Sequence, residues 1–269
     1  MLHAVSFIGL VQSQLVRLSQ SKHAPKKSSG LPKEGVIKFD IDHSDAILTA
    51  IERRSADRIK LVRDFLYNLH LVGQYLSGPY QGLGFGNVSE LLPVQDQRED
   101  TLKTFCITGT QTGTIKALDS GKHFAVVTEY DFEKYRIKAH GCIKPSSEAI
   151  THAAIYESSP HIQAIIHVHS PVLWQALLLS PDDEVLKTAK DVEYGSYELA
   201  QAIRQLIKEN QKQGWFLTAG HDDGLFFYGP NLVKTLELTL QVYKIVFKVS
   251  PVVIQNMKRL VARLETWNK

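Results

Sequence analysis

The chain has 269 residues, of which 43% are hydrophobic and 22% charged, a composition typical of a folded globular protein and not of a disordered one. It contains two cysteines, Cys106 and Cys142, which are too few for a disulfide framework and suit a reducing compartment. The formal net charge is +3, and no apolar run reaches the roughly 18 residues that would predict a membrane-spanning helix.

The positive charge is concentrated at the N-terminus. Residues 1–38 contain six lysines and arginines against one glutamate, a net charge of +5, so the rest of the chain carries −2. We therefore predict a basic, flexible leader over residues 1–40 and a single domain over residues 41–269. Because the basic charge belongs to the leader, nucleic-acid binding is not predicted. The absence of acids before Glu34 leaves open an organelle transit segment, the alternative to a cytoplasmic location.

Helical and strand patterns alternate along the rest of the chain, which predicts an α/β or α+β fold. Apolar residues at helical spacing follow a candidate N-cap, Ser55, and a glycine-rich turn follows that helix. In chain order we expect helix 55–76, turn 78–91, strands 105–108, 123–131 and 135–138, helix 146–157, strand 162–170, a helix from 170, helix 194–213, strands 214–220 and 224–229, and a helical segment 231–267 that Pro251 breaks.

Two histidines, His167 and His169, stand two positions apart in an otherwise apolar strand pattern. Side chains alternate between the faces of a strand, so both imidazoles should point to one face and the flanking Ile166 and Val168 to the other. Two imidazoles on one face could share a metal ion. They could equally be two ordinary histidines, because such a pair alone is a weak motif.

A third ligand would decide between these interpretations, because catalytic zinc sites commonly use three protein ligands and keep one position open. His221 is the candidate, since it lies in a tight turn between two predicted strands. Three other histidines compete with it in sequence: His140, His152 and His161.

Glu148 falls at the start of a predicted helix, directly after Ser146 and Ser147. It could simply complement the helix dipole. It could also act as a general acid/base, beside backbone N–H groups and serine hydroxyls that hold an anion. The nearby turn with glycines at 82, 84 and 86 lacks the strand and helix of a dinucleotide-binding motif, so a nucleotide site is not predicted.

Five short segments contain these residues and occur in this order: Gly86-Asn87-Val88-Ser89, Ile107-Thr108-Gly109-Thr110, Lys144-Pro145-Ser146-Ser147-Glu148, His167-Val168-His169 and Gly220-His221. Together they resemble the class II aldolase/adducin family, over about residues 45 to 250. That family includes sugar-phosphate aldolases, a ribulose-phosphate epimerase and a sugar-phosphate dehydratase. The resemblance implies a three-layer α/β/α sandwich around a largely antiparallel central sheet.

The resemblance also implies roles for individual residues. His167, His169 and His221 would bind a divalent metal, most often zinc, and Glu148 would be the catalytic acid/base. The substrate, a small sugar or sugar phosphate, would undergo aldol cleavage through a metal-stabilised enediolate. Its phosphate would be surrounded by a set of polar and glycine residues: Gly86, Asn87, Thr110, Ser146 and Ser147. Members usually form tetramers, so a homo-oligomer is expected.

The chain departs from the family pattern at two positions. Gln111 stands where the aldolases carry a glycine close to phosphate, and Asp191 stands near the position of an aldolase tyrosine, with Tyr194 and Tyr197 close by in sequence. Both are tentative site residues. These departures leave epimerase, dehydratase or decarboxylase chemistry open. An adducin-like structural module without enzyme activity is the alternative of another class. The basic, amphipathic C-terminal segment is expected at a subunit interface and not on a membrane.

Overall fold

The computed structural model describes residues 35–77, 80–93, 103–180 and 185–267. Its centre is an eight-stranded sheet in the order β1-β7-β6-β5-β4-β8-β10-β9. Every neighbouring pair is antiparallel except β1 and β7, which are parallel. The strands are β1 (Asp40–Ser44), β4 (Asn87–Leu91), β5 (Phe105–Thr108), β6 (Phe124–Asp131), β7 (Arg136–His140), β8 (Ala164–His169), β9 (Gly214–Leu217) and β10 (Gly224–Gly229).

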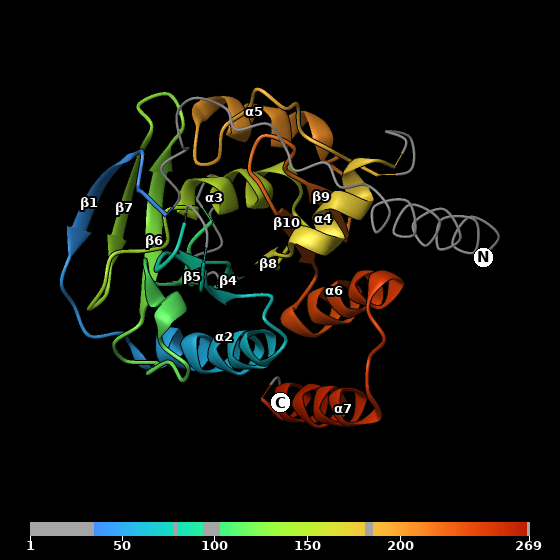
Figure 1. The fold of residues 1–269 in the computed structure, drawn as a ribbon. Coiled ribbons are helices and arrows are strands. Elements are labelled where there is room, and N and C mark those ends of the chain that lie inside the picture. The colour runs from blue at the N-terminus through green and yellow to red at the C-terminus, as the bar shows by residue number, and fades with distance from the viewer. Residues whose placement is uncertain (1–34, 78–79, 94–102, 181–184, 268–269) are drawn as a thin grey trace.

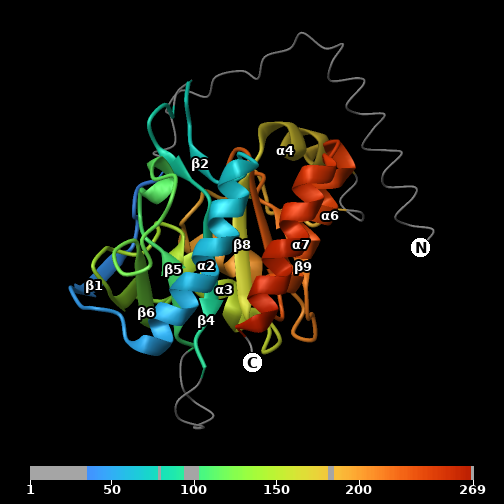
Figure 2. The same ribbon diagram turned by 90° about the horizontal axis from the view of Figure 1, so that it is seen from below.

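Helices cover both faces of this sheet, which gives three layers (Figures 1 and 2). One face packs against α2 (Ala50–Asn68), α4 (Pro171–Leu178) and α6 (Leu232–Val246), and α7 (Pro251–Thr266) packs against α2 and α6. The other packs against α3 (Ala149–Ser158) and α5 (Tyr197–Leu206). The predicted α/β sandwich around a largely antiparallel sheet is confirmed.

The central strand β8 is buried along its whole length. Ile166 and Val168 belong to the core under α2 and α6, whereas Ile165 belongs to the core under α3. A strand covered on both faces needs apolar residues at nearly every position. The two histidines are therefore the exceptions in an apolar strand.

The first helix begins earlier than the sequence pattern predicts. Thr49 is its N-cap: the Thr49 hydroxyl accepts the Glu52 N–H at 3.4 Å, and the Glu52 carboxylate accepts the Thr49 N–H at 2.7 Å. The prediction of Ser55 as the N-cap is wrong, because the Ser55 hydroxyl instead donates to the Glu90 carboxylate at 3.0 Å. Both residues have the right chemistry for a cap, but only Thr49 is followed three positions later by a glutamate, which completes a capping box.

The glycine-rich segment expected to be a turn contains strands. Within it, β3 (Gly84–Phe85) pairs with β2 (Gly73–Gln74), and its last part is β4. β2 lies in the predicted helix 55–76, so the predicted end of that helix is wrong: α2 ends at Asn68. Gly86 joins β3 to β4 with a φ of +74°, which favours glycine. A Cβ there would lie 2.6 Å from Val72 Cγ1 and 3.0 Å from the His167 carbonyl oxygen. The glycine therefore lets this turn approach β8 closely.

The C-terminal segment divides at Pro251 as expected, but the proline begins a helix and does not merely interrupt one. Ser250 caps α7, and Pro251 occupies its first turn, where a missing N–H costs nothing. None of the helices in the described ranges has the length and apolar character needed to cross a membrane. The predicted leader, residues 1–40, lies outside the described residues up to position 34, so its flexibility stays a prediction.

Candidate active site

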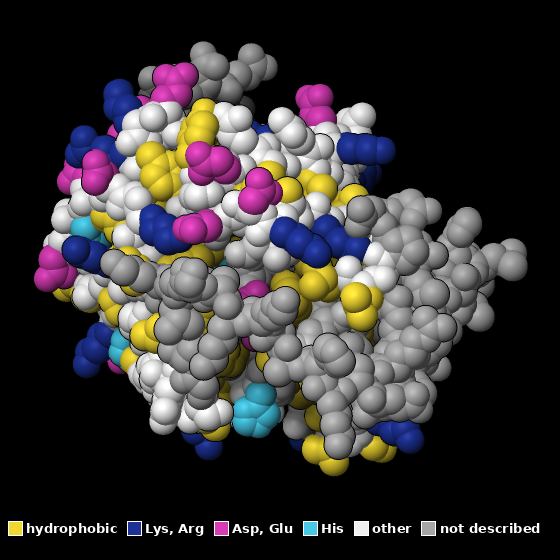
Figure 3. All heavy atoms as spheres, turned by 45° about the horizontal axis from the view of Figure 1, so that its top comes forward, with side chains coloured by type: hydrophobic (Ala, Val, Ile, Leu, Met, Phe, Trp, Pro, Cys, Tyr) yellow, Lys and Arg dark blue, Asp and Glu magenta, His cyan; other side chains and the backbone are white. Residues whose placement is uncertain are grey.

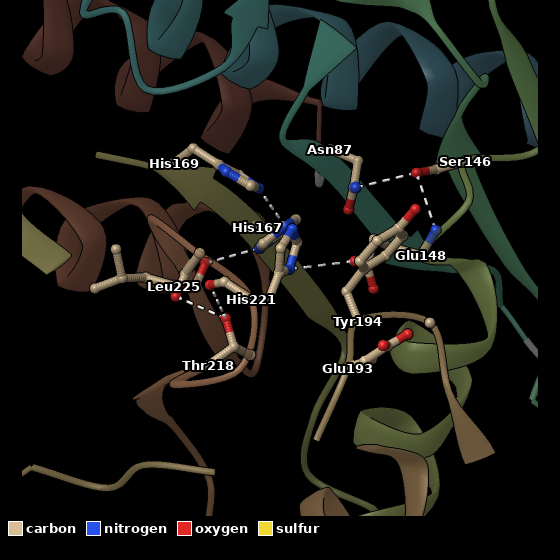
Figure 4. A network of polar contacts seen from close by, with 12 residues as sticks. Asn87, Ser146, Glu148, His167, His169, Glu193, Tyr194, Thr218, His221 and Leu225 are labelled. Atoms are coloured by element: carbon tan, nitrogen blue, oxygen red, sulfur yellow. Dashed lines mark hydrogen bonds and ion pairs between the residues drawn. The ribbon is translucent and has the colours of Figure 1, made fainter. Parts of the chain in front are cut away.

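Three buried histidines meet at the end of β8 (Figure 4). His167 and His169 lie on the same face of β8, and His221 lies in the connection between β9 and β10. Each histidine offers one ring nitrogen, and these nitrogens all lie within 4.8 Å of one another. The structure thus brings together the three residues that the sequence analysis grouped.

The pairing of β10 with β8 positions His221. The two strands are antiparallel, with Gly224 opposite His169 and Phe226 opposite His167. Inside the turn, the Thr218 hydroxyl lies 3.2 Å from the His221 carbonyl oxygen and 2.9 Å from the Gly224 carbonyl oxygen. A Cβ on Gly224 would lie 3.3 Å from His167 Cε1. A glycine at this position therefore allows the turn to fold over the first two imidazoles.

Hydrogen bonds fix the ring orientations of the two β8 histidines. His167 Nδ1 lies 3.0 Å from the Leu225 carbonyl oxygen, which can only accept, so this nitrogen carries the proton and Nε2 keeps its lone pair. The Nε2 atoms of His167 and His169 are 3.0 Å apart. The Phe226 ring stacks on His167 with centroids 3.9 Å apart, which further restricts that ring.

Burial also controls the charge of these two rings. Removal from water lowers the pKa of His167 and of His169 well below the usual value, and the neighbouring His221 acts in the same direction on both. Both imidazoles are therefore neutral at physiological pH. A neutral imidazole is the form that binds a metal ion, so the donor set fits a divalent cation.

Glu148 lies beside the histidines and is only 3% exposed. Its Oε1 atom is 3.5 Å from His221 Nδ1. Glu148 is the N-cap residue of α3, and not a residue of its first turn. Its N–H donates to the Ser146 hydroxyl at 3.3 Å, and the Asn87 amide donates to the same hydroxyl at 3.0 Å. β4, β8 and the start of α3 therefore converge on one point.

A small cavity of about 30 Å³ adjoins this cluster. It is lined by all the predicted site residues except His221 and Asp191: Gly86, Asn87, Thr110, Gln111, Ser146, Ser147, Glu148, His167 and His169. His221 closes the cluster from the side, with its ring centroid 5.6 Å from that of His167. Asp191 is exposed, and the structure does not bring it to the cavity.

Tyr194, and not Asp191, lies against the histidine cluster. Its ring is 2% exposed and its centroid lies 4.8 Å from that of His221. Lys38 holds this residue from the other side, with its ammonium 3.9 Å from the ring centroid and 3.0 Å from the Tyr194 carbonyl oxygen. Sequence reasoning placed Tyr194 near the site only by its distance along the chain.

Tyr75 is a site residue that sequence reasoning missed. Its hydroxyl lies 2.8 Å from His169 Nδ1, the ring nitrogen that does not face His167. Such a contact orients an imidazole and fixes which nitrogen carries the proton. No motif marks Tyr75, since it reaches His169 only through the β2–β3 hairpin.

Comparison with known proteins identifies the family. Residues 83–246 match the model of the class II aldolase and adducin N-terminal domain, which is more than half of the chain. The chain belongs to the class II aldolase/adducin family.

Solved structures give the same fold. One is YgbL from Klebsiella pneumoniae, a candidate aldolase/epimerase/decarboxylase, with a TM-score of 0.52 and 21% identity over 74% of this chain and 89% of that one. The other is YgbL from Escherichia coli, a candidate for the same activities, with a TM-score of 0.49 and 18% identity over 80% of this chain and 89% of that one. At these identities the likeness to the Klebsiella protein supports the fold alone.

Proposed function

We propose that this family member is a metal-dependent, lyase-type enzyme that cleaves a small sugar-like substrate in an aldol reaction. One observation carries the proposal: three buried histidine nitrogens lie within 4.8 Å of one another, with a buried carboxylate 3.5 Å from one of them. A core seldom gathers so many polar side chains without a use for them.

We propose His167, His169 and His221 as the ligands of a divalent cation, most often zinc in sites of this type. The residues fit this role, because His167 and His169 are held neutral by burial and three neutral ligands leave the charge of the cation uncompensated. When bound, such a cation supplies Lewis-acid polarisation of a substrate carbonyl, worth several kcal/mol of barrier.

The other residues would handle the substrate and its proton. Glu148 is placed to take a proton from a substrate hydroxyl or carbon as an enediolate forms, and to return it. Ser146 and Asn87 are already hydrogen-bonded to each other, so they present a preformed polar wall for the substrate oxygens. Gly86, Thr110 and Ser147 line the same cavity. This arrangement orients a hydroxy-ketone beside the base.

Epimerase, dehydratase or decarboxylase chemistry is the alternative within the family. The observation that favours this alternative is that no tyrosine stands at the position of the aldolase tyrosine. Asp191, near the position of the aldolase tyrosine, is exposed, and the Tyr194 hydroxyl accepts the Val36 backbone N–H at 3.2 Å. With Tyr194 bonded to Val36, Glu148 becomes the candidate proton donor for the aldol leaving group, which favours reactions that use one acid/base.

The compartment, oligomeric state and partner of the enzyme are also part of the proposal. We propose a cytoplasmic homo-oligomer, since Cys106 and Cys142 are both free and family members are often oligomeric. On the face that Figure 3 shows, basic and acidic side chains are interspersed, which is unlike the one-signed patch of a nucleic-acid-binding face. A sugar-like small molecule is therefore the proposed partner.

Metal analysis tests the proposal. Wild type and His167→Ala would be loaded with zinc, dialysed and assayed for bound metal, with His161→Ala as the control because His161 is exposed and away from the cluster. We expect about one zinc per chain in wild type and in the control, and little in His167→Ala. Equal, low zinc in all three would overturn the metal site.

Activity separates the enzyme from the adducin-like alternative. Zinc-loaded protein would be incubated with small ketoses, both free and phosphorylated, and the aldehyde, epimer, dehydrated product or carbon dioxide would be measured. Cleavage that His167→Ala loses supports the lyase. Release of carbon dioxide or an epimer would instead favour the alternative chemistry, and zinc binding with no turnover on any substrate would favour a non-catalytic module.

A further inference from the structure

Gln111 has an unusual backbone conformation beside the cavity. Its φ is +55° and its ψ is +22°, in the left-handed region that favours glycine. It precedes the short 3-10 helix η1 (Thr112–Thr114) and makes no side-chain capping bond to it. A residue with a Cβ in this region is strained, and such strain tends to be kept where the side chain has a use. The side chain of Gln111 therefore needs an explanation.

The carboxamide of Gln111 bonds two backbone segments at the mouth of the cavity. Its Oε1 accepts the Gly84 N–H at 3.2 Å, and its Nε2 donates to the Gly35 carbonyl oxygen at 3.0 Å. Gly35 is also left-handed, with φ of +70°, and a Cβ there would lie 2.4 Å from Gln111 Nε2. The Gln111 carboxamide thus fits between Gly35 and Gly84. It accepts the Gly84 N–H, which would otherwise be free to bind a ligand in the cavity.

The size of the cavity agrees with this interpretation. With Gln111 in place its volume is about 30 Å³, roughly two to three times the ~10–15 Å³ that a cavity needs to hold one water molecule. The same cavity is lined by His167, His169 and Glu148, so a molecule held by the histidines shares it with Gln111. A phosphate group at the Gly84 N–H would have to displace the carboxamide.

The charge of the cavity lining also favours a hydroxyl group over a phosphate. Among the described residues that line it, none is lysine or arginine, and Glu148 is an acid. A phosphate dianion would gain no cationic partner from these side chains, whereas the Gln111 carboxamide, after its bonds to Gly84 and Gly35, keeps one donor hydrogen and one acceptor lone pair. A hydroxyl group both donates and accepts, which matches a carboxamide.

We propose that Gln111 is a specificity-determining residue, and that it selects a substrate whose end group is an uncharged hydroxyl and not a phosphate. This rests on the proposed metal-dependent function of the same cavity and narrows its substrate class. The expectation of a phosphorylated substrate, which came from the family resemblance, is then replaced by that of a free sugar-like hydroxy-ketone.

Two hydroxamates that differ only in a phosphate provide the test. Glycolohydroxamate and phosphoglycolohydroxamate both resemble an enediolate and both bind metal ions. Their Kd values would be measured by calorimetry on zinc-loaded wild type, Gln111→Gly and Gln111→Ala. Glycine adopts a positive φ without strain, so Gln111→Gly should keep the backbone conformation. Gln111→Ala gives a second measurement in case Gln111→Gly does not fold. His70→Gly is the matched control, an exposed residue with φ of +57° away from the cavity.

In wild type we expect glycolohydroxamate to bind at least as tightly as its phosphorylated form. In both Gln111 variants we expect phosphoglycolohydroxamate to bind about tenfold or more tighter than in wild type, while glycolohydroxamate changes less than about threefold. His70→Gly should behave as wild type. A wild-type preference for the phosphorylated compound, or an unchanged ratio in the variants, would overturn the role of Gln111.

The same measurements distinguish failure of the proposed function. If neither hydroxamate binds zinc-treated wild type and the protein retains no zinc, the metal site is wrong and the inference falls with it. If glycolohydroxamate binds but the ratio does not respond to Gln111, the metal site stands and only the role of Gln111 is wrong.

Discussion

Glu148 Oε1 lies 3.5 Å from Nδ1 of His221, although α3 and the β9–β10 turn are far apart in the chain. Both groups are nearly inaccessible to water. A buried carboxylate beside the proposed ligand set would either help to hold the metal or move a proton. These roles make different predictions for one substitution.

Replacing Glu148 with glutamine tests them. Glutamine keeps the shape but cannot accept a proton, so Glu148→Gln should retain zinc and lose about 10²- to 10⁴-fold in kcat. Metal analysis and the rate of substrate cleavage give the two readouts. Glu209→Gln, at an exposed position, should leave both unchanged. Loss of zinc in Glu148→Gln would show that the carboxylate is a ligand and not only a base.

Metal removal should destabilise the protein. A ligand that binds only the folded state stabilises it by about 2.7 kcal/mol at a free concentration of about 100 times its Kd. Adding excess chelator to zinc-loaded protein should therefore lower Tm by several degrees, measured by calorimetry. His221→Ala should have a Tm that hardly responds to zinc or chelator. An equal response in wild type and in this variant would contradict the assignment of His221 as a ligand.

Gly86→Ala should both destabilise the fold and weaken metal binding. The new Cβ would lie 2.6 Å from Val72 Cγ1 and 3.0 Å from the His167 carbonyl oxygen, at a φ of +74°. We expect a loss of about 2 kcal/mol or more in the free energy of unfolding, measured with denaturant, since overpacking adds to the cost of the positive φ.

Gly195→Ala is the matched control for this change. Gly195 also has a positive φ, +58°, but its Cβ would meet only the Ser147 carbonyl oxygen at an ordinary 3.5 Å. It should cost about 1 kcal/mol, the conformational term alone. Equal losses in the two variants would mean that the close approach of Gly86 to β8 is unimportant.

Acid should destabilise the fold through His152. This residue is fully buried on α3, its Nδ1 lies 2.7 Å from the Ser89 hydroxyl, and burial lowers its pKa from 6.5 to about 3. The unfolded chain therefore binds more protons than the folded one between about pH 6.5 and 3. The contribution to stability is complete above the unfolded pKa and is lost as pH falls through this window, by about 2 kcal/mol at pH 5.

Denaturant unfolding at pH 7 and pH 5 measures this effect. His152→Gln, which cannot titrate, should show a smaller decrease in the free energy of unfolding between the two values, by about 2 kcal/mol. His161→Gln, on the surface, should behave as wild type. The same pH dependence in His152→Gln and wild type would show that other groups are responsible.

Much of the fold was readable from the sequence because its signals are local. The short apolar run within residues 162–170 predicted β8, and Pro251 predicted the division between α6 and α7. The start of α2 is also encoded locally, because Thr49 and Glu52 form the Thr-x-x-Glu pattern of a capping box, whereas Ser55 has Arg58 three positions later. The contact of the Ser55 hydroxyl with Glu90, which lies in a strand far along the chain, was not readable.

By itself, the sequence determined which side chains are candidates for the chemistry: two imidazoles on one face of a strand, a third in a following turn, and a carboxylate after two serines. These candidates can be recognised from residue type and short spacing along the chain. Tertiary structure decided that the four groups meet, that Tyr75 and Tyr194 support the rings while Asp191 stays in solvent, and that Gln111 takes the Gly84 N–H. The reason is that strand register and helix packing set distances between segments remote in sequence, and no local pattern encodes them.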